Sequence, residues 1–353
     1  MGQVSAPVQL SSLTTLGLGG PAPQLIDGID DDTIREVVTA ADRDGSPLLL
    51  IAGGSNLVIA DAGVDHPVLR IATHGVSAER DGDDLLIDVA AGEPWDEVVH
   101  AFVADGWSGL ASLSGIPGRT GATPIQNVGA YGTEISAVLV DVTLHDRATG
   151  ELRRVPATDL HLGYRTSMLR GTDAAVVLRV RLRLTRIPPP VRYAELARML
   201  NVHSGDGAPP AEVRAAVLEL RRGKGMVLDP ADPDTRSVGS FFTNPILDYD
   251  QAEIVDRQIR ARFGTDAHYP RYPAENGAKL SAAWLIERAG FPRGFALPGA
   301  PGAAISSKHT LALTNRGGST ADLLALARHI REGVVDAFGI ELNAEPILVG
   351  VQL

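Results

Sequence analysis

The sequence predicts an α+β protein of two or three domains. Its 353 residues exceed what one hydrophobic core usually serves. Hydrophobic residues make up 44% of the chain and charged residues 21%, which is ordinary for a globular protein. Helical and strand patterns alternate along the chain, and one long segment rich in glycine and proline interrupts them.

The first third of the chain mixes helix and strand. Residues 31–45 carry apolar side chains at helical spacing, Asp31 or Asp32 can cap this helix, and Gly45 ends it. A short apolar strand then enters a Gly-Gly turn, and a second strand precedes a helix that a proline opens. These elements are a strand at 47–52, a strand at 84–90 and a helix that begins at Pro94.

The rest of the chain continues the mixture. Residues 176–184 alternate between aliphatic residues and arginines, which predicts a strand with one buried and one wet face. Residues 204–210 are a polar linker rich in proline and glycine. The other predicted elements are a hairpin at 138–155, helices at 211–223, 279–289 and 319–338 (the last capped by Ser319 or Thr320 and stopped by Gly339), a boundary at 229–234 and a strand at 346–351.

Composition excludes several classes of function. The formal net charge of -11 argues against general binding of nucleic acid or anionic membranes, although a local cationic cluster can still hold an anionic ligand. The absence of cysteine excludes disulfides, thiolate metal sites and cysteine nucleophiles, and no metal site is expected. No apolar run reaches the ~20 residues of a membrane helix, and no secretory signal is visible. We expect a cytoplasmic protein without membrane insertion.

Two glycine-containing segments favour a nucleotide cofactor. Gly53-Gly54-Ser55-Asn56 follows an apolar strand, and successive amides of such a turn form a concave anion site. Residues 115–132 form a long loop, poor in charge, in which Gln126 and Asn127 supply amide groups and Tyr131 can pack beside a ring. The residues alone leave an ordinary strand–turn–strand and a structural Ω-type loop open.

Three further positions are candidates for catalysis. Arg165, in Tyr164-Arg165-Thr166-Ser167, can hold a carboxylate or stabilise developing negative charge. Ser240 lies in Gly239-Ser240-Phe241-Phe242-Thr243-Asn244-Pro245, beside a tight turn and two aromatic residues, and Glu345 precedes the last predicted strand. Read singly, these residues are more simply an exposed arginine, an ordinary buried serine and a solvated glutamate. The segment around Ser240 is not G-x-S-x-G, so a serine hydrolase is not indicated.

Taken together and in order, these segments resemble the UDP-N-acetylenolpyruvoylglucosamine reductase family in its long, first-type form. The resemblance runs from Thr14-Thr15-Leu16-Gly17 to the C-terminal strand, with Leu16 where phenylalanine is common and a varied Gly118-Arg119-Thr120-Gly121. It implies a two-subdomain FAD-binding fold of the vanillyl-alcohol-oxidase type with a C-terminal α+β substrate domain. The absence of a G-x-G-x-x-G after a strand agrees, because this fold holds FAD without a Rossmann motif.

The resemblance also implies the roles of individual residues. The catalytic residues would be Arg165, Ser240 and Glu345, with Ser240 as proton donor. The substrate would meet Tyr193, Lys224 and Asn244; Arg221 and Arg222 lie close to Lys224 in the sequence, and the role of His309 stays open. FAD, held non-covalently, would contact Gly53, Gly54, Ser55, Asn56, Leu57, Gly115, Pro117, Gly118, Gly121, Ala122, Ile125, Gln126, Asn127, Gly129 and Tyr131.

The implied domains are residues 1–73 (rejoined by 339–353) and 74–228 around FAD, and 229–338 for the substrate. The implied activity is NADPH-dependent reduction of a UDP-linked enolpyruvyl sugar in peptidoglycan precursor synthesis, with the UDP-sugar and NADPH as partners and a monomer as the simplest state. Two alternatives remain: an FAD-dependent alcohol or amine oxidase on the same fold, and a non-catalytic nucleotide-binding protein. The 115–132 loop contains no histidine or cysteine that could tether a flavin.

Overall fold

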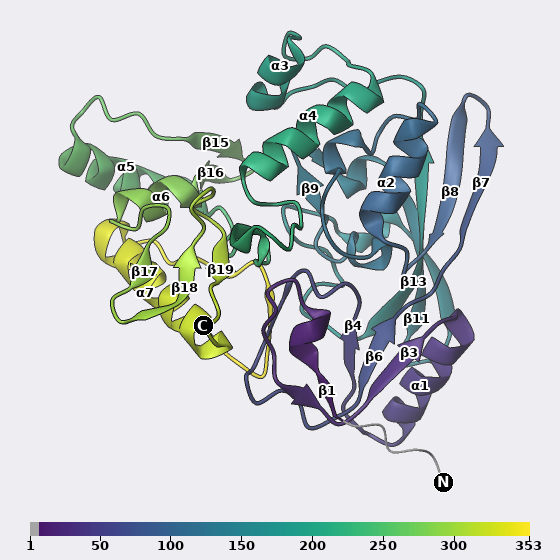
Figure 1. Cartoon of the computed structure of the whole chain (residues 1–353). Helices are drawn as coiled ribbons and strands as arrows, with labels where there is room; N and C mark the ends of the chain where they lie inside the picture. Colours follow the sequence, from purple (N-terminus) through teal and green to yellow (C-terminus); the bar gives the residue numbers. More distant parts are fainter. Residues whose placement is uncertain (1–6) are drawn as a thin grey trace. The chain divides into compact units, whose positions relative to one another are not determined.

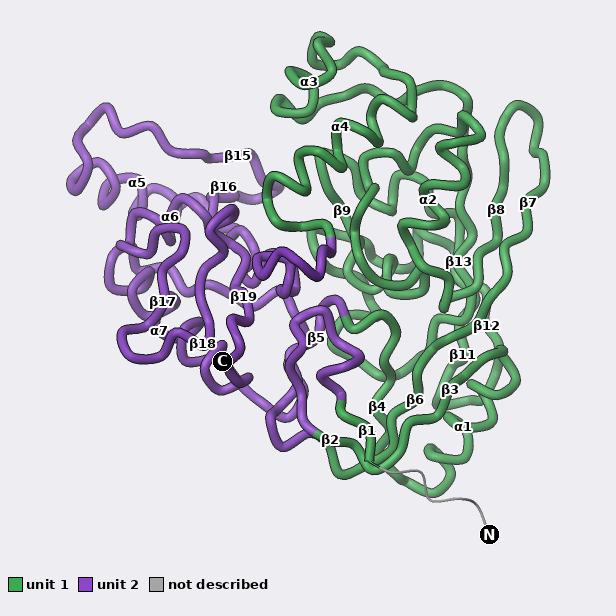
Figure 2. The backbone as a smooth tube through the Cα atoms, in the orientation of Figure 1, with its two compact units in different colours: residues 1–9, 21–54, 64–227 green, residues 10–20, 55–63, 228–353 purple. Residues whose placement is uncertain are grey.

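The computed structural model describes residues 7–353 and contains both helices and strands throughout (Figure 1). It divides into two compact units that we describe one at a time (Figure 2). The first unit contains residues 7–9, 21–54 and 64–227, and the second contains residues 10–20, 55–63 and 228–353. Each unit has its own cluster of buried apolar side chains.

The first unit is built on a five-stranded antiparallel sheet. Its central strand, β13, has Leu178, Val180 and Leu182 fully buried, while Arg181 on the other face pairs with Asp141 of β11. This confirms the predicted half-buried strand, because the two faces meet different surroundings. In sheet order the strands are β12 (Leu152–Pro156), β11 (Leu139–Asp146), β13 (Ala175–Leu184), β8 (Asp84–Ala90) and β7 (Val76–Asp81).

A second sheet of the first unit is parallel and carries the first helix. Helix α1 (Asp31–Arg43) packs on β3 and β6 through Ile34 and Val38 (Figure 1). Its cap is Asp30, whose carboxylate accepts the amide of Thr33 at 2.7 Å, so the prediction of Asp31 or Asp32 was wrong by one position. The strands are β3 (Leu25–Gly28), β6 (Val68–Ile71) and β4 (Leu49–Ile51), and the short pair β1 (Val8–Gln9) and β2 (Pro21–Ala22) lies nearby in sequence.

Three more helices complete the first unit. Helix α2 begins directly after Pro94, as predicted, and buries Trp95, Val98 and Val99. The helices are α2 (Trp95–Ala104), α3 (Ala194–Leu200) and α4 (Pro210–Gly223). The long loop between α2 and β11 is ordered by short 3-10 turns at Ala111–Leu113, Thr120–Ala122 and Ile135–Ala137 and by the strands β9 (Gly129–Ala130) and β10 (Thr133–Glu134).

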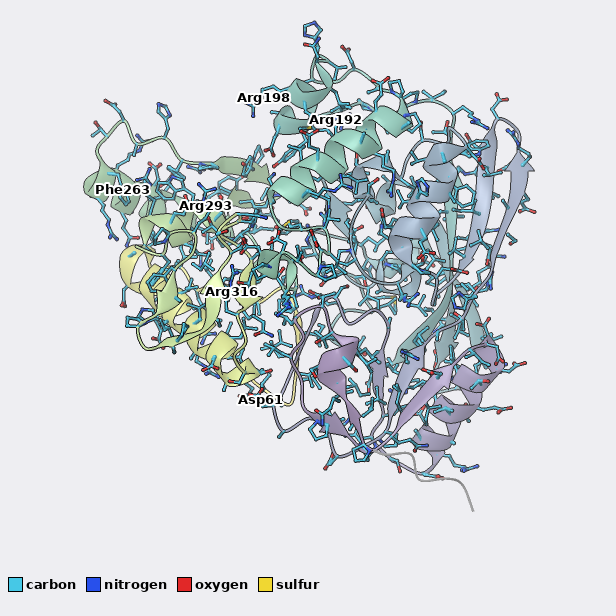
Figure 3. The ribbon with its side chains drawn as sticks, viewed as in Figure 1. Asp61, Arg192, Arg198, Phe263, Arg293 and Arg316 are labelled. Carbon is cyan, nitrogen blue, oxygen red and sulfur yellow. The ribbon has the colours of Figure 1, made fainter. Side chains whose placement is uncertain are left out.

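In the second unit, the C-terminal strand pairs with a strand from the first part of the sequence. Strand β20 (Ile347–Val349) pairs in parallel with β5 (Leu57–Ile59). The carboxylate of Asp61, just after β5, accepts hydrogen bonds from the amides of Thr320 and Ala321 at 2.8 and 2.9 Å. Asp61 thereby caps the helix that begins at Thr320 (Figure 3). That helix, α7 (Thr320–Phe338), is also capped by Ser319 and stopped by Gly339, as the sequence predicts.

The remainder of the second unit contains two three-stranded antiparallel sheets and two helices. The predicted helix over 279–289 begins only at Ala282, because Gly277–Leu280 is strand β16 and Ser281 is the helix cap. The elements are β14 (Ile246–Asp248), α5 (Tyr249–Phe263), β15 (Arg271–Ala274), β16 (Gly277–Leu280), α6 (Ala282–Arg288), β17 (Ala296–Leu297), β18 (Ala300–Ile305) and β19 (Leu313–Asn315). Within residues 7–353, no helix has the length and apolarity needed to cross a bilayer.

Candidate active site

In the first unit, the first glycine turn touches the long loop. A Cβ atom on Gly53 would lie 2.7 Å from the Cα atom of Gly118, so only glycine permits this approach. Gly118 has a φ angle of 121°, and its carbonyl accepts the amide of Trp95 at 3.1 Å. The two segments that the sequence marked as cofactor-binding are therefore in direct backbone contact.

Two more predicted glycines fasten the loop to neighbouring elements. The amide of Gly115 donates to the Asp96 carboxylate at 2.6 Å, and Asp96 also holds Arg214 of α4 through two hydrogen bonds. The amide of Gly121 donates to the carbonyl of Ala91 at 2.8 Å, and a Cβ atom on Gly121 would lie 2.5 Å from the Cβ atom of Ala91. These contacts fix the loop's backbone without large side chains.

Asn127 organises the loop from within. Its side chain is buried, donates to the Glu134 carboxylate at 2.8 Å and to the Gly163 carbonyl at 3.0 Å, and accepts the amide of Ser136 at 3.1 Å. Its backbone has a φ angle of 46°, a conformation that asparagine tolerates better than most residues. The amide group of Asn127 thus serves the loop itself, and a contact with the cofactor stays a prediction.

The segment around Arg165 lies against the same loop. The guanidinium Nη2 of Arg165 donates to the Gly129 carbonyl at 2.9 Å, and the Ser167 hydroxyl donates to the Ile125 carbonyl at 2.6 Å. Arg165 has a φ angle of 54°, which an arginine adopts only where its surroundings hold it. Two motifs that the sequence offered separately are adjacent in the first unit.

Tyr131, Tyr193 and Lys224 form a cluster, although the sequence assigned Tyr131 to the cofactor and the other two to the substrate. The rings of Tyr131 and Tyr193 meet edge to face at 5.3 Å, and the Lys224 ammonium lies 5.5 Å from the centre of the Tyr131 ring. Burial raises the pKa of Tyr131 to about 12, so its phenol stays protonated at neutral pH. The Lys224 ammonium also pairs with Glu195 at 2.6 Å, a partner that no sequence motif indicated.

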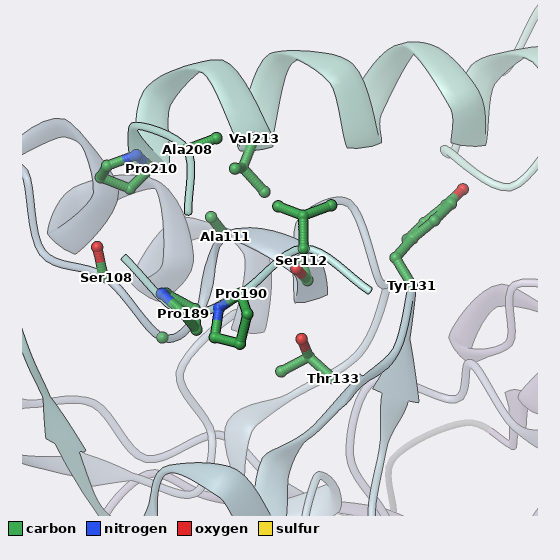
Figure 4. A pocket seen from close by; sticks show the side chains of 12 residues that line it. Ser108, Ala111, Ser112, Tyr131, Thr133, Pro189, Pro190, Ala208, Pro210 and Val213 are labelled. Atoms are coloured by element: carbon green, nitrogen blue, oxygen red, sulfur yellow. The ribbon is translucent and has the colours of Figure 1, made fainter. Parts of the chain in front are cut away.

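A narrow cleft opens beside Tyr131 (Figure 4). Its walls combine apolar side chains with polar groups, among them the hydroxyl groups of Ser108, Ser112 and Thr133. Pro189, Pro190 and Val191, which precede Tyr193, form one side of it. The remaining lining residues are Gly109, Ala111, Ala208, Pro210 and Val213.

In the second unit, Ser240 and Glu345 lie on neighbouring extended segments. Ser240 bridges to Ala312 on one side, where the amide of Phe241 donates to the carbonyl of Leu311 at 2.7 Å. On the other side the amide of Glu345 donates to the carbonyl of Phe241 at 2.8 Å. Phe241 and Phe242 are fully buried, which anchors the segment that presents Ser240.

The second half of the first turn also lies in the second unit, next to Glu345. Asn56 accepts the amide of Ile347 on its own carbonyl at 2.9 Å, and its side-chain amide reaches the carbonyl of Glu345 at 3.5 Å. Leu57 is in register with Ile347 in the parallel pair β5 and β20. The predicted cofactor residues Ser55, Asn56 and Leu57 therefore share a neighbourhood with one predicted catalytic residue.

Two other residues of interest hold local structure. The side-chain oxygen of Asn244 accepts the amide of Ala282 at 2.9 Å, at the start of α6. His309 accepts the amide of Leu311 on Nδ1 at 3.2 Å, so its neutral ring carries the proton on Nε2. Within the described residues, no group of three or more histidine, aspartate or glutamate side chains could hold a metal ion.

Comparison with known proteins finds family models and relatives that match nearly the whole chain. A family model described as the C-terminal domain of UDP-N-acetylenolpyruvoylglucosamine reductase matches residues 230–349, and an FAD binding domain model matches residues 29–156. UDP-N-acetylenolpyruvoylglucosamine reductases of Saccharopolyspora erythraea and Thermobifida fusca are 55% and 52% identical to this chain. The alignments cover 98% of this chain in both cases, and 95% and 98% of the respective relatives.

A solved structure agrees with these sequences. The crystal structure of UDP-N-acetylenolpyruvylglucosamine reductase from Thermus caldophilus superimposes with a TM-score of 0.64 at 25% identity, over 97% of this chain and 98% of that one. The predicted fold class is thereby confirmed, as an FAD-binding domain of the vanillyl-alcohol-oxidase type followed by the reductase C-terminal domain. The chain belongs to the UDP-N-acetylenolpyruvoylglucosamine reductase family.

Proposed function

We propose how the residues of this chain divide the work of the family's reaction, with Ser240 as proton donor and Arg165 and Glu345 as stabilisers of the enol. Members of the family are FAD-dependent UDP-N-acetylmuramate dehydrogenases of peptidoglycan precursor synthesis that use NADPH. The observation that carries the proposal is the pairing of the Ser240 and Glu345 segments, because it brings an acid and a hydroxyl onto neighbouring extended backbone.

The residues of the first unit fit a flavin dinucleotide. Gly54 is buried, yet among the described residues neither its amide nor that of Gly53 donates to a backbone carbonyl. Buried amides normally have a partner, and a pyrophosphate oxygen is a suitable one. Gly53, Gly54 and the 115–132 loop would hold FAD, which when bound supplies a hydride that it first receives from NADPH.

The three catalytic residues handle the charge and the proton. Once the β-carbon of the vinyl ether has accepted a hydride, negative charge develops next to the substrate carboxylate. Arg165 stabilises it with its planar guanidinium, and Glu345 holds the enol proton. Ser240 delivers a proton to the α-carbon in a step that needs nearby hydrogen bonds or a cation, since a free hydroxyl is a very weak acid.

Tyr193, Lys224 and Asn244 hold the UDP-sugar. The Lys224 ammonium neutralises phosphate charge, and Tyr193 closes over the nucleotide from the proline-flanked segment. The edge-to-face contact of Tyr193 with Tyr131 and the cation above the Tyr131 ring support one common binding surface in the first unit. Tyr131 is then available to the nucleotide as well as to the cofactor.

The finer assignments belong to the same proposal. We propose two FAD subdomains, 1–73 with 339–353 and 74–228, and a substrate domain at 229–338; the pairing of β20 with β5 supports the return of the chain to the first part. The long, first-type form, a monomeric state and a cytoplasmic location are proposed on the motif pattern and the absence of cysteine, which suits a reducing compartment. The net charge of -11 argues against nucleic acid as a partner, and an anionic substrate is held locally by a cation such as Lys224 despite that overall sign.

One experiment tests the assignment against its rivals. The purified protein should be yellow and release free FAD on acid treatment, and NADPH should bleach it without oxygen. Addition of the enolpyruvyl UDP-sugar should then restore the flavin absorbance. Bleaching by an alcohol or amine instead of NADPH would identify an oxidase, and no bleaching would identify a binding protein.

A further inference from the structure

Lys224, which the proposed function assigns to the substrate's phosphates, is paired with the carboxylate of Glu195 in this structure. The Lys224 ammonium lies 2.6 Å from the Glu195 carboxylate, and their side chains are 24% and 36% exposed. Glu195 lies in the first turn of α3, and Lys224 caps the C-terminus of α4. A carboxylate and a phosphate are both anions with oxygen acceptors, so they compete for the same donors.

A second proposed substrate residue, Tyr193, directly precedes the helix that carries Glu195. Tyr193 is the N-cap of α3, and its ring rests against Tyr131. The ion pair therefore ties the segment of Tyr193 to the end of α4 at the cluster formed by Tyr131, Tyr193 and Lys224. The residues before Tyr193 line the narrow cleft, so this segment is not tightly packed there (Figure 4). They are Pro189, Pro190 and Val191.

Other nearby cations are less suited to exchange partners. Arg221 is buried and donates from Nη2 to the Met226 carbonyl at 2.8 Å. Arg192, just before α3, and Arg198, within α3, are both exposed (Figure 3). Lys224 differs because it is half-buried and directed at an aromatic ring and a carboxylate, which gives it a defined position before any ligand arrives.

We propose that the Glu195 carboxylate occupies the phosphate-binding position beside the Lys224 ammonium in the substrate-free protein. The diphosphate of the UDP-sugar then displaces it from Lys224. The proposal rests on the proposed function of Lys224. Displacement costs the existing ion pair, so the Glu195 carboxylate lowers substrate affinity and sets the substrate concentration at which the enzyme works. It also couples phosphate binding to release of the α3 segment that carries Tyr193.

The test compares steady-state KM for the UDP-sugar in Glu195→Gln, Glu195→Ala and the control Glu219→Gln. Glu219 is exposed on α4, so its variant changes the net charge equally without touching Lys224. We expect both Glu195 variants to lower KM about two- to fivefold, the range for a partly exposed ion pair, with the control unchanged. In Glu195→Gln, KM should also rise more steeply with salt than in the wild type. In the wild type, salt weakens the competing Lys224–Glu195 pair as well as the contact between Lys224 and phosphate, and the two effects partly cancel.

The outcomes separate this inference from the proposed function. If Lys224→Ala raises KM and the Glu195 variants leave KM unchanged or raise it, Glu195 is not a competitor and the inference is overturned while the role of Lys224 stands. If Lys224→Ala leaves KM unchanged, the assigned role of Lys224 fails and the inference fails with it. A double variant with Lys224→Ala should show no further effect of Glu195→Gln.

Discussion

The amide of Glu345 donates a 2.8 Å hydrogen bond to the carbonyl of Phe241, the residue that follows Ser240. The same carbonyl-bearing segment is held on its other edge by Leu311, and its two phenylalanines are buried. Ser240 and Glu345 are thus positioned by one small piece of sheet-like backbone. Substitutions of their side chains leave these backbone bonds in place, which makes chemical effects separable from structural ones.

Replacing Ser240 by alanine should damage one half-reaction only. NADPH reduction of the flavin should stay near the wild-type rate, and reoxidation by the enolpyruvyl UDP-sugar should fall by roughly 10²-fold or more, because a positioned proton donor is lost. Stopped-flow absorbance measures both half-reactions. Ser240→Cys should recover part of the loss, since a thiol also donates a proton. Equal damage to both half-reactions would assign Ser240 a structural role.

Replacing Glu345 by glutamine should abolish turnover while substrate affinity is mostly kept. The amide keeps the shape and the backbone bond to Phe241 but cannot hold or return a proton in the same way. Titration of the flavin absorbance with the UDP-sugar gives affinity, and single-turnover reoxidation gives the rate. Glu341→Gln is the control, since Glu341 makes an exposed pair with Arg331. Normal turnover of Glu345→Gln would remove this residue from the mechanism.

Replacing Arg165 by lysine should slow flavin reoxidation by roughly 10²-fold and weaken substrate binding, because lysine keeps the charge but loses the planar donor fork. The variant also loses the guanidinium that donates to the Gly129 carbonyl. Arg154→Lys, on the exposed edge strand β12, controls for the substitution itself. A variant that keeps the wild-type rate of reoxidation would contradict the assigned role of Arg165.

Local signals predicted a large part of the fold. In β13, leucine or valine alternates with arginine, and α7 has its cap and stop residues at its two ends. Each of these signals depends only on a few neighbouring residues. Helix α5 was not predicted, although Asp248 and Gln251 form a capping box, because its buried positions are few and its surface is highly charged. The last two residues of strand β16 were included in a predicted helix, because Leu280 fits both the helical and the strand period.

The site was predicted only as far as its motifs are local. The Arg165 segment and the 115–132 loop were each visible, but their contact through Gly129 depends on tertiary structure. Glu195 and Lys224 are 29 residues apart, and neither carries a motif that points to the other. Contacts of this kind follow from the tertiary packing of segments that are distant in sequence, which periodicity and turn signals do not encode.

Asp234 holds the stretch that leads to the bridge partner of Ser240, and we expect its contribution to stability to depend on pH. Burial alone would raise the pKa of its carboxyl, but hydrogen bonds from Ser307 and the charge of Arg316 outweigh burial and hold the pKa below its ordinary value. The folded-state pKa is depressed, so the stability that Asp234 contributes is present above its unfolded pKa near 3.8 and is lost as pH falls through the folded value. Ser307 belongs to the stretch that leads to Ala312, the bridge partner of Ser240.

Asp234→Asn should lower the free energy of unfolding at pH 7 by about 1–3 kcal/mol, because the partly exposed Arg316 loses its charged partner and Ser307 loses a carboxylate acceptor. Chemical denaturation at pH 7 and pH 3 measures the effect, and the difference from wild type should shrink at the lower pH. Lys308→Met, which breaks the more exposed pair with Asp232, should cost about 1 kcal/mol or less. Equal losses in the two variants would show that burial of the Asp234 pair is unimportant.

Tyr193 and Lys224 should act on binding more than on chemistry. Tyr193→Ala and Lys224→Ala should each raise KM for the UDP-sugar about tenfold or more and leave NADPH reduction of the flavin intact, the result expected when uniform binding is lost. Because the Lys224 contact is electrostatic, wild-type affinity should fall with salt, and Lys224→Ala should flatten that dependence. Arg222→Ala is the matched control, since Arg222 is exposed two positions away. An unchanged salt dependence in Lys224→Ala, with a flattened one in Arg222→Ala, would move the phosphate contact to Arg222.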